Sequence, residues 1–264
     1  MTSVSLSRRD LNVLGKIKDP ESDPASGVWI DASLPKDPNV RDQSIYDRIS
    51  ERERAIVLSM QQLELQLAGA RPRTTSDIPA EYQSCVSQLG TLISDHPDYA
   101  SARNNRAQAL RRLHGDTMLV AGVPSGPAAL LRDADDSQRL EAAKTVLSDL
   151  DRSISLLTPS TPWTGLSPQS AKTLSMAHTQ RAAIYHTTSK LLGSNTLSVD
   201  PQRREAGWSK LEFEERASRD FAMGGKFGNE IAKGLAVSTN PTAKLCGQIV
   251  REAMKKEYGP DFEM

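Results

Sequence analysis

One segment of the chain carries an apolar stripe with helical spacing, and this stripe limits the folds open to the chain. Its apolar residues recur in steps of three, four, three, four and three, and Thr158-Pro159 closes the run. The stripe consists of Leu140, Ala143, Leu147, Leu150, Ile154 and Leu157. Because this spacing puts all these side chains on one face of a helix, the face has to be covered by another element of the fold.

Similar patterns predict helices along most of the remaining chain. A second stripe, with steps of three, four and three before Pro97, consists of Tyr82, Cys85, Leu89 and Leu92. Further helices are predicted over 54–67, 100–113, 170–192, 208–223 and 241–257. The first of these carries Leu58 and Leu65 among its apolar residues, and the last carries Leu245 and Ile249.

A β-sheet is not expected. No segment of the sequence alternates Val, Ile or Thr with polar residues over the length of a strand, and aromatic residues make up only 5% of the chain. Strands favour β-branched and aromatic residues. The sequence therefore predicts an all-α fold.

The first 45 residues differ from the rest of the chain. Residues 1–45 are predicted to form an N-terminal tail with a short docking helix and a linker, and residues 46–264 to form the helical domain. The docking helix covers 11–17, where Val13, Leu14 and Ile17 share one face, and we expect this face to pack on the domain. The linker is rich in Pro, Asp and Ser, and Trp29 within it is expected to pack back on the chain's own domain.

The charge balance argues against two classes of partner. Lys and Arg together number 33, and so do Asp and Glu, so no overall field attracts nucleic acid or an anionic membrane. No stretch reaches the roughly 18 apolar residues that a membrane span needs. Cys85 and Cys246 are too few for a disulfide framework or a zinc site and are interpreted as reduced thiols. We therefore expect the protein in the cytoplasm, with the nucleus as a second compartment. We also expect a monomer or weak dimer.

Three pairs of predicted helices share a pattern of small and large residues. In order, these are Leu58, Gln61, Gln62, Leu65, Cys85, Leu89 and Pro97; Arg103, Arg106, Ala107, Leu110, Val146, Leu150 and Pro159; His178, Arg181, Ala182, Tyr185, Ala217 and Phe221. The positions fit the tetratricopeptide pattern, in which small residues let two helices touch and large ones fill the groove to the next pair. The sequence thus predicts an α-solenoid of about three helix-turn-helix repeats plus a C-terminal capping helix.

The predicted repeats are stretched by long loops. Pro97 and Pro159 are 62 residues apart, so about 28 residues are inserted beyond one repeat. The loops at 114–137 and 193–207 are either decoration or a second binding surface, and the sequence leaves both interpretations open.

Two strings carry a resemblance to a known family. Residues 104–111 read NNRAQALR, and residues 240–246 read NPTAKLC. Both resemble segments of the tetratricopeptide repeat protein 36 family. Shorter matches come in the family's order: Val13-Leu14 with Ile17 and Pro20, Asp149-Leu150-Asp151-Arg152, Gln180-Arg181, and Arg219-Asp220-Phe221 with Gly228. The chain resembles a divergent member of this family with loop insertions.

The resemblance implies a co-chaperone-like adaptor that binds the chaperone Hsp70. Repeats of this type hold a chaperone's C-terminal carboxylates in a clamp of Lys, Asn and Arg on the concave face. Here Asn105 stands at one clamp position, whereas Ser59, Leu63, Met176 and Gln180 stand where Lys, Asn, Lys and Arg are wanted. Capture of a chaperone tail by a full clamp is not expected, and contact with Hsp70 through another surface stays open.

The concave face of the predicted repeats is the candidate binding surface. The residues expected to point into it are Gln62, Gln66, Asn104, Asn105, Gln108, Arg112 and Gln180. As a set they would hydrogen bond to an extended peptide or a helix of a partner. The alternative is a polar face that water covers and no ligand binds.

No catalytic or metal motif stands out in the sequence. The histidines include no His-Glu-x-x-His motif, and His178 and His186 are eight residues apart on one predicted helix. The segment 224–228, GGKFG, lacks the spacing of a phosphate-binding loop and a strand before it, and is expected to end a helix. We expect a protein that is not an enzyme and holds no metal or cofactor. It either binds Hsp70 or a client, or directly stabilises or regulates a metabolic enzyme, as in amino-acid catabolism.

Overall fold

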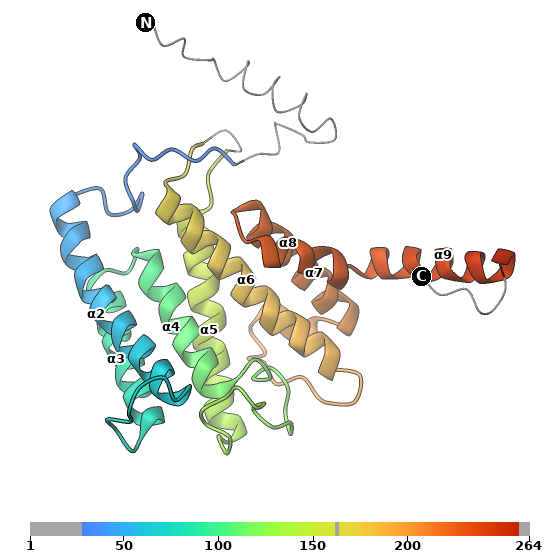
Figure 1. Ribbon diagram of the computed structural model, residues 1–264, viewed down its shortest axis with the longest axis horizontal. Coiled ribbons are helices and arrows are strands. Elements are labelled where there is room, and N and C mark those ends of the chain that lie inside the picture. Colours follow the sequence, from blue (N-terminus) through green and yellow to red (C-terminus); the bar gives the residue numbers. More distant parts are fainter. Residues whose placement is uncertain (1–27, 162–163, 259–264) are drawn as a thin grey trace, which may run out of the picture.

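The computed structural model describes residues 28–161 and 164–258, and the regular structure of these residues is helical (Figure 1). The elements are α2 (Gln43–Leu67), α3 (Ile78–Asp95), α4 (Ala100–His114), α5 (Asp136–Leu157), α6 (Pro168–Leu191), the short 3₁₀ helix η1 (Arg204–Gly207), α7 (Lys210–Lys226), α8 (Glu230–Thr239) and α9 (Pro241–Tyr258). Isolated β-bridges aside, the described ranges contain no strand. The predicted all-α class is confirmed.

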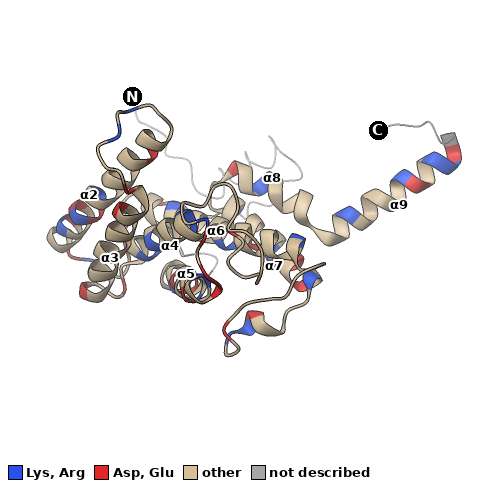
Figure 2. Ribbon diagram, turned by 90° about the horizontal axis from the view of Figure 1, so that it is seen from below, with Lys and Arg blue, Asp and Glu red and all other residues tan. Residues whose placement is uncertain are grey.

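The helices form two layers. Consecutive helices pack in the pairs α2 with α3, α4 with α5, and α6 with α7, while α4 also contacts α2 and α6. Figure 2 shows the layers end-on, with α2, α4 and α6 on one side and α3, α5 and α7 on the other. This stacking of helix pairs is the solenoid arrangement that the repeat pattern predicts.

Polar side chains fix where the helices begin. Asp42 accepts hydrogen bonds from the backbone of the first turn of α2, and Asp135 and Ser167 do the same for α5 and α6. Ser209 and Glu212 form a reciprocal capping box at the start of α7. These caps satisfy backbone donors that a helix leaves without an internal partner, so the polar residues set the helix boundaries.

The predicted stripes of α3 and α5 lie in the core. Leu89 and Leu92 of α3 and Leu147 and Leu150 of α5 are fully buried in one continuous cluster. In the third pair, Tyr185 of α6 packs edge to face against other aromatic rings, those of Trp208 and Phe213.

Helix α2 differs from the prediction in register. It buries Ile49, Ile56 and Leu63, whereas Leu58 and Leu65 are 45% and 39% exposed. Only one side of α2 packs on α3 and α4, because it is the first described helix of the stack. Its apolar residues therefore do not all mark the buried face.

The C-terminal end contains a helix that the sequence pattern does not predict. α8 packs against α7, and a Cβ at Gly225 would lie 2.8 Å from the Cα of Lys233, so the glycine permits this close approach. The predicted capping helix is α9, which projects beyond α8 (Figure 1) with Leu245 and Ile249 more than half exposed. The helix that packs on α7 at the C-terminal end of the stack is thus α8.

The two long loops contact each other. The backbone N–H of Ser198 donates to the carbonyl oxygen of Leu119 at 2.8 Å, and the N–H of Ala121 donates to Thr196 at 3.0 Å. The buried guanidinium of Arg139 in α5 donates to the carbonyl oxygens of Thr117 and Val120. The loops are therefore a folded part of the domain.

Residues 28–42 run along the loop between α5 and α6. The N–H of Asp31 donates to the carbonyl oxygen of Leu166 at 2.8 Å, and the hydroxyls of Ser167 and Ser170 donate to the carbonyl oxygen of Lys36 at 2.9 and 3.0 Å. Trp29 lies against Gly165, although its side chain stays 43% exposed. The predicted docking helix at 11–17 lies outside the described residues.

Candidate functional site

A groove with a volume of ≈ 1210 Å³ lies between α2, α4 and α6. We call it the α2–α4–α6 groove. The groove forms because the first helix of each pair, α2, α4 or α6, turns the same face toward this side of the stack. Residues 36 and 37 and the start of α6 close one end, and residues 115, 116 and 128 of the long loop close the other.

Much of the lining is apolar. Val57, Met60 and Leu65 of α2 face Ala109 of α4 and Met176 of α6 across the groove. Methionine side chains adapt their shape to different ligands, and apolar walls release water when a ligand covers them. The lining thus suits a protein segment with apolar side chains.

Glu64 and Arg112 form an ion pair at the end of the groove near the long loop. Arg112 donates from Nε to Oε1 of Glu64 at 2.7 Å and from Nη2 to Oε2 at 3.2 Å, and the hydroxyl of Tyr82 also donates to Glu64. Burial acts to raise the pKa of Glu64, but the hydrogen bonds from Arg112 and Tyr82 outweigh it and lower that pKa. The charges at this end are therefore balanced within the chain.

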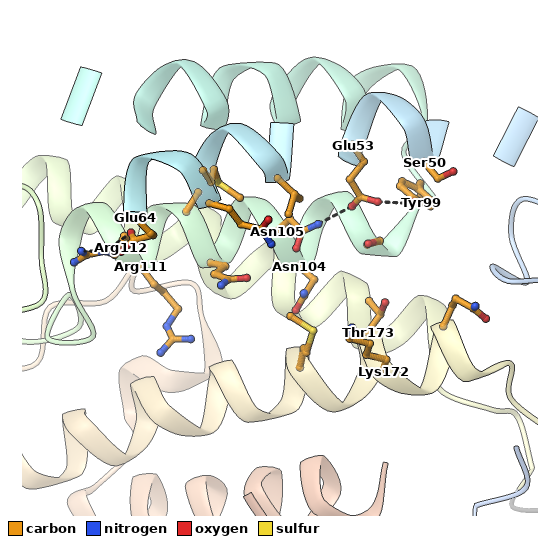
Figure 3. Close-up of a pocket in the computed structure, with 18 of the residues that line it drawn as sticks. Ser50, Glu53, Glu64, Tyr99, Asn104, Asn105, Arg111, Arg112, Lys172 and Thr173 are labelled. Carbon is orange, nitrogen blue, oxygen red and sulfur yellow. Dashed lines mark hydrogen bonds and ion pairs between the residues drawn. The ribbon is translucent and has the colours of Figure 1, made fainter. Parts of the chain in front are cut away.

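The other end of the groove has a different charge arrangement, centred on Glu53. Glu53 is only 7% exposed, and it accepts hydrogen bonds from the Tyr99 hydroxyl at 2.5 Å and the Asn105 amide at 2.7 Å. Figure 3 shows these three side chains together at one end and Glu64 with Arg112 at the other. Burial raises the pKa of Glu53 above its ordinary value, and the charge of Asp37 adds to this.

Four of the predicted groove residues line the groove. These are Asn104, Asn105, Gln108 and Arg112, all from α4. Gln108 is exposed, whereas Asn105 is held by Glu53 and Arg112 by Glu64. The structure brings these four together because they lie on one face of a single helix.

The other three lie elsewhere. Gln62 is exposed on α2 outside the groove lining. Gln66 is buried, and its Oε1 accepts from the N–H of Thr74 at 2.9 Å. Gln180 is buried between α4 and α6, where its Nε2 donates to Oδ1 of Asn104 at 2.8 Å and its Oε1 accepts from Arg111. The amide groups of Gln66 and Gln180 are thus used inside the fold.

The pattern of polar residues does not single out several residues that line the groove. They are Lys36, Asp37, Tyr46, Ser50, Glu53, Glu64, Tyr99, Arg111, Asp116, Lys172 and Thr173. Glu53 and Glu64 are eleven residues apart, three helical turns, so α2 alone places both on one face. That spacing is the one feature of the sequence that indicates a shared face for Glu53 and Glu64.

The positions of a chaperone-type clamp are not assembled in the groove. Leu63 and Gln180 are buried, and Ser59 is outside the lining, so of these positions only Met176 and Asn105 face the groove. Glu53 next to Asn105 would repel a carboxylate group.

The polar cluster around Asp220 ties α6 to α7. His178 Nδ1 lies 2.8 Å from Oδ1 of Asp220, and Arg181 donates to both of its oxygens. Within the described residues, no three His, Cys, Asp or Glu side chains gather as metal ligands would, and no helix is long and apolar enough to cross a membrane.

Two curated proteins resemble this chain over most of its length. The L-tyrosine degradation gene cluster protein hmgX of Aspergillus fumigatus is 36% identical over 260 residues, covering 96% of this chain and 93% of the relative. Tetratricopeptide repeat protein 36 of Danio rerio is 26% identical over 221 residues, covering 84% of this chain and 83% of that protein. No family model matches the sequence. No solved structure shows significant similarity to it.

Proposed function

Because this chain belongs to the family of the L-tyrosine degradation gene cluster protein hmgX, we propose that it is a non-enzymatic adaptor that binds a protein of L-tyrosine degradation in the α2–α4–α6 groove. The partner is an enzyme of that degradation, which the adaptor stabilises or regulates by direct contact. The weaker similarity to tetratricopeptide repeat protein 36 supports a more distant relation to that family.

The groove is the observation that carries this proposal. It combines apolar side chains such as Met60 and Met176 with hydrogen-bonding groups from α4, of which Gln108 is exposed. Extended peptides and amphipathic helices are recognised by such a combination, because the apolar wall supplies affinity and the polar groups fix the register. A protein segment is therefore a better fit than a small metabolite.

At the end of the groove near the long loop, the pairing of the ionisable side chains favours a binding role over catalysis. Arg111 holds Asp116 with hydrogen bonds of 2.7 and 2.8 Å, and Arg112 holds Glu64. A catalytic acid or base has to exchange a proton with substrate, whereas these groups are held in ion pairs within the chain.

Binding to Hsp70 is the second candidate. The similarity to a tetratricopeptide repeat protein favours it, because repeats of this type bind chaperones. The clamp positions are not assembled in the groove, which argues against binding of a chaperone's C-terminal tail there. A chaperone would therefore use a different surface of this protein. We place the protein in the cytoplasm, with the nucleus as the alternative, and expect a monomer or weak dimer.

A pull-down from cells grown on L-tyrosine tests the proposal. Full-length protein is compared with the groove variant Asn105→Ala plus Gln108→Ala and with the control Gln62→Ala plus Gln83→Ala, whose residues are exposed outside the groove. We expect mass spectrometry to find an enzyme of L-tyrosine degradation with the wild type and the control, and a loss of it with the groove variant. Equal retention by all the proteins would refute the groove as the binding site, and recovery of Hsp70 alone would favour the second candidate.

A further inference from the structure

Two buried carboxylates lie at the Glu53 end of the groove. Asp37 and Glu53 are 4% and 7% exposed, and each lines the groove. They are close enough for the charge of one to raise the pKa of the other, and burial raises the pKa of both. We call these carboxylates, with the rings of Tyr46 and Tyr99, the acidic corner.

The described part of the chain supplies no ion pair for either carboxylate. Glu53 accepts from Tyr99 and Asn105, and Asp37 accepts from the N–H of Asn39 at 2.8 Å. The two arginines of the groove are engaged at its other end, with Asp116 and Glu64. An uncompensated buried carboxylate is costly for the fold, so this corner attracts a cation.

A cationic group of the chain already lies at the mouth of the corner. The Nζ of Lys36 is 5.2 Å from the centre of the Tyr46 ring, within the range of a cation–π contact. The Tyr46 and Tyr99 rings meet edge to face at 6.2 Å. Lys36 itself is exposed and makes no ion pair with the carboxylates among the described residues, so it does not neutralise either of them.

We propose that the acidic corner receives a lysine or arginine side chain of the partner protein, with apolar residues beside it in the partner's sequence. The ammonium or guanidinium group pairs with Glu53 at the inner end, and Tyr46 flanks it. The neighbouring apolar residues cover Val57 and Met60 on the next turns of α2. A repeat groove that usually selects a carboxylate would here select a cation. For the identity of the partner, this inference rests on the proposed function.

Selection of a random peptide library displayed on phage tests the chemistry without a known partner. The full chain, Glu53→Gln and Glu51→Gln are used in parallel; Glu51 is exposed on α2 outside the groove, so its variant changes the net charge equally. We expect the wild type and Glu51→Gln to enrich Lys or Arg next to apolar residues. Glu53→Gln should lose this preference and bind the selected peptides at least tenfold more weakly.

Two further measurements separate binding from folding. The thermal midpoint of Glu53→Gln is expected to stay close to that of the wild type. The amide oxygen of glutamine can still accept from Asn105, its NH₂ group can donate to the hydroxyl oxygen of Tyr99, and a buried charge is removed. If the variant unfolds instead, the selected peptides with Lys or Arg replaced by Gln supply the same test on the wild type.

The outcomes distinguish this inference from the proposed function. Peptides without basic residues, or equal binding by Glu53→Gln and Glu51→Gln, would overturn the cation site even if the pull-down finds an enzyme. Basic peptides that depend on Glu53 would support it even if the pull-down finds no protein of L-tyrosine degradation.

Discussion

Arg181 of α6 and Asp220 of α7 form a bidentate ion pair, with Nε 2.7 Å from Oδ2 and Nη2 2.8 Å from Oδ1. Arg106 of α4 and Asp149 of α5 form the same arrangement, at 2.6 and 2.8 Å. Each pair joins the two helices of one repeat at the same place. Arg106 lies in the string 104–111, and Asp149, Arg181 and Asp220 lie in the shorter matches to the tetratricopeptide repeat protein 36 family. The ion pairs explain why Arg and Asp recur at these positions of the repeat.

Replacing Asp220 by Asn tests the strength of this joint. Asp220 is 5% exposed, and its loss as an anion leaves Arg181 with a single carboxylate partner, Asp151. We expect the free energy of unfolding to fall by about 3 kcal/mol, measured by urea denaturation. The control is Asp95→Asn, which breaks the half-exposed pair with Arg52 and should cost about 0.5 kcal/mol or less. Equal losses in the two variants would contradict the role of the buried pair.

The stability of the loop before α7 should depend on pH through Glu205. This buried carboxylate accepts from Tyr185 at 2.6 Å and pairs with Arg203; burial opposes ionisation, but these contacts prevail and lower its pKa from 4.5 to about 2. A lowered folded-state pKa adds stability above about 4.5, and that stability is lost as pH falls toward about 2.

Glu205→Gln removes this titration. We expect urea denaturation to show a smaller difference between wild type and variant at about pH 3 than at about pH 7. The decrease should be about 1 to 2 kcal/mol, because water screens the half-exposed Arg204 that also contacts Glu205. A difference independent of pH would show that Glu205 does not titrate in this way.

The contact between α7 and α8 should not tolerate a side chain at Gly225. A Cβ there would meet the backbone of Lys233 at 2.8 Å, so Gly225→Ala has to push the helices apart. We expect a loss of about 1 to 2 kcal/mol in the free energy of unfolding. Gly234→Ala, in α8 with no atom within 4 Å of the new Cβ, should instead gain up to about 1 kcal/mol from helix propensity. A gain in both variants would show that α8 does not pack as described.

Truncation separates the two parts of the N-terminal segment. Removing residues 1–41 deletes the contacts to Leu166, Ser167 and Ser170 but keeps the Asp42 cap, and we expect the thermal midpoint to drop by about 5 °C relative to removal of 1–27. Comparison of the 1–27 deletion with the full chain tests the predicted docking of 11–17. An unchanged midpoint there would refute that docking.

The sequence by itself determined most of the helices and the pairing of α2 with α3, α4 with α5 and α6 with α7. Stripes such as the one from Leu140 to Leu157 depend only on spacing, and caps such as Ser209 act on their own first turn, so these features follow from local rules. The Arg–Asp pairs also belong to positions that the repeat pattern aligns. The prediction of the buried face was wrong for α2. One side of this helix has no covering neighbour among the described elements, so apolar residues there stay exposed.

Only the tertiary structure decided which polar residues line the groove. Gln66, Gln108 and Gln180 are alike in the sequence. In the structure Gln108 is exposed in the groove, whereas Gln66 is hydrogen-bonded to Thr74 and Gln180 to Asn104. Glu53 accepts a hydrogen bond from Tyr99, which is 46 residues away in the chain, and both side chains are buried. Burial and long-range hydrogen bonds arise only when distant helices meet, so no spacing along the chain reports them.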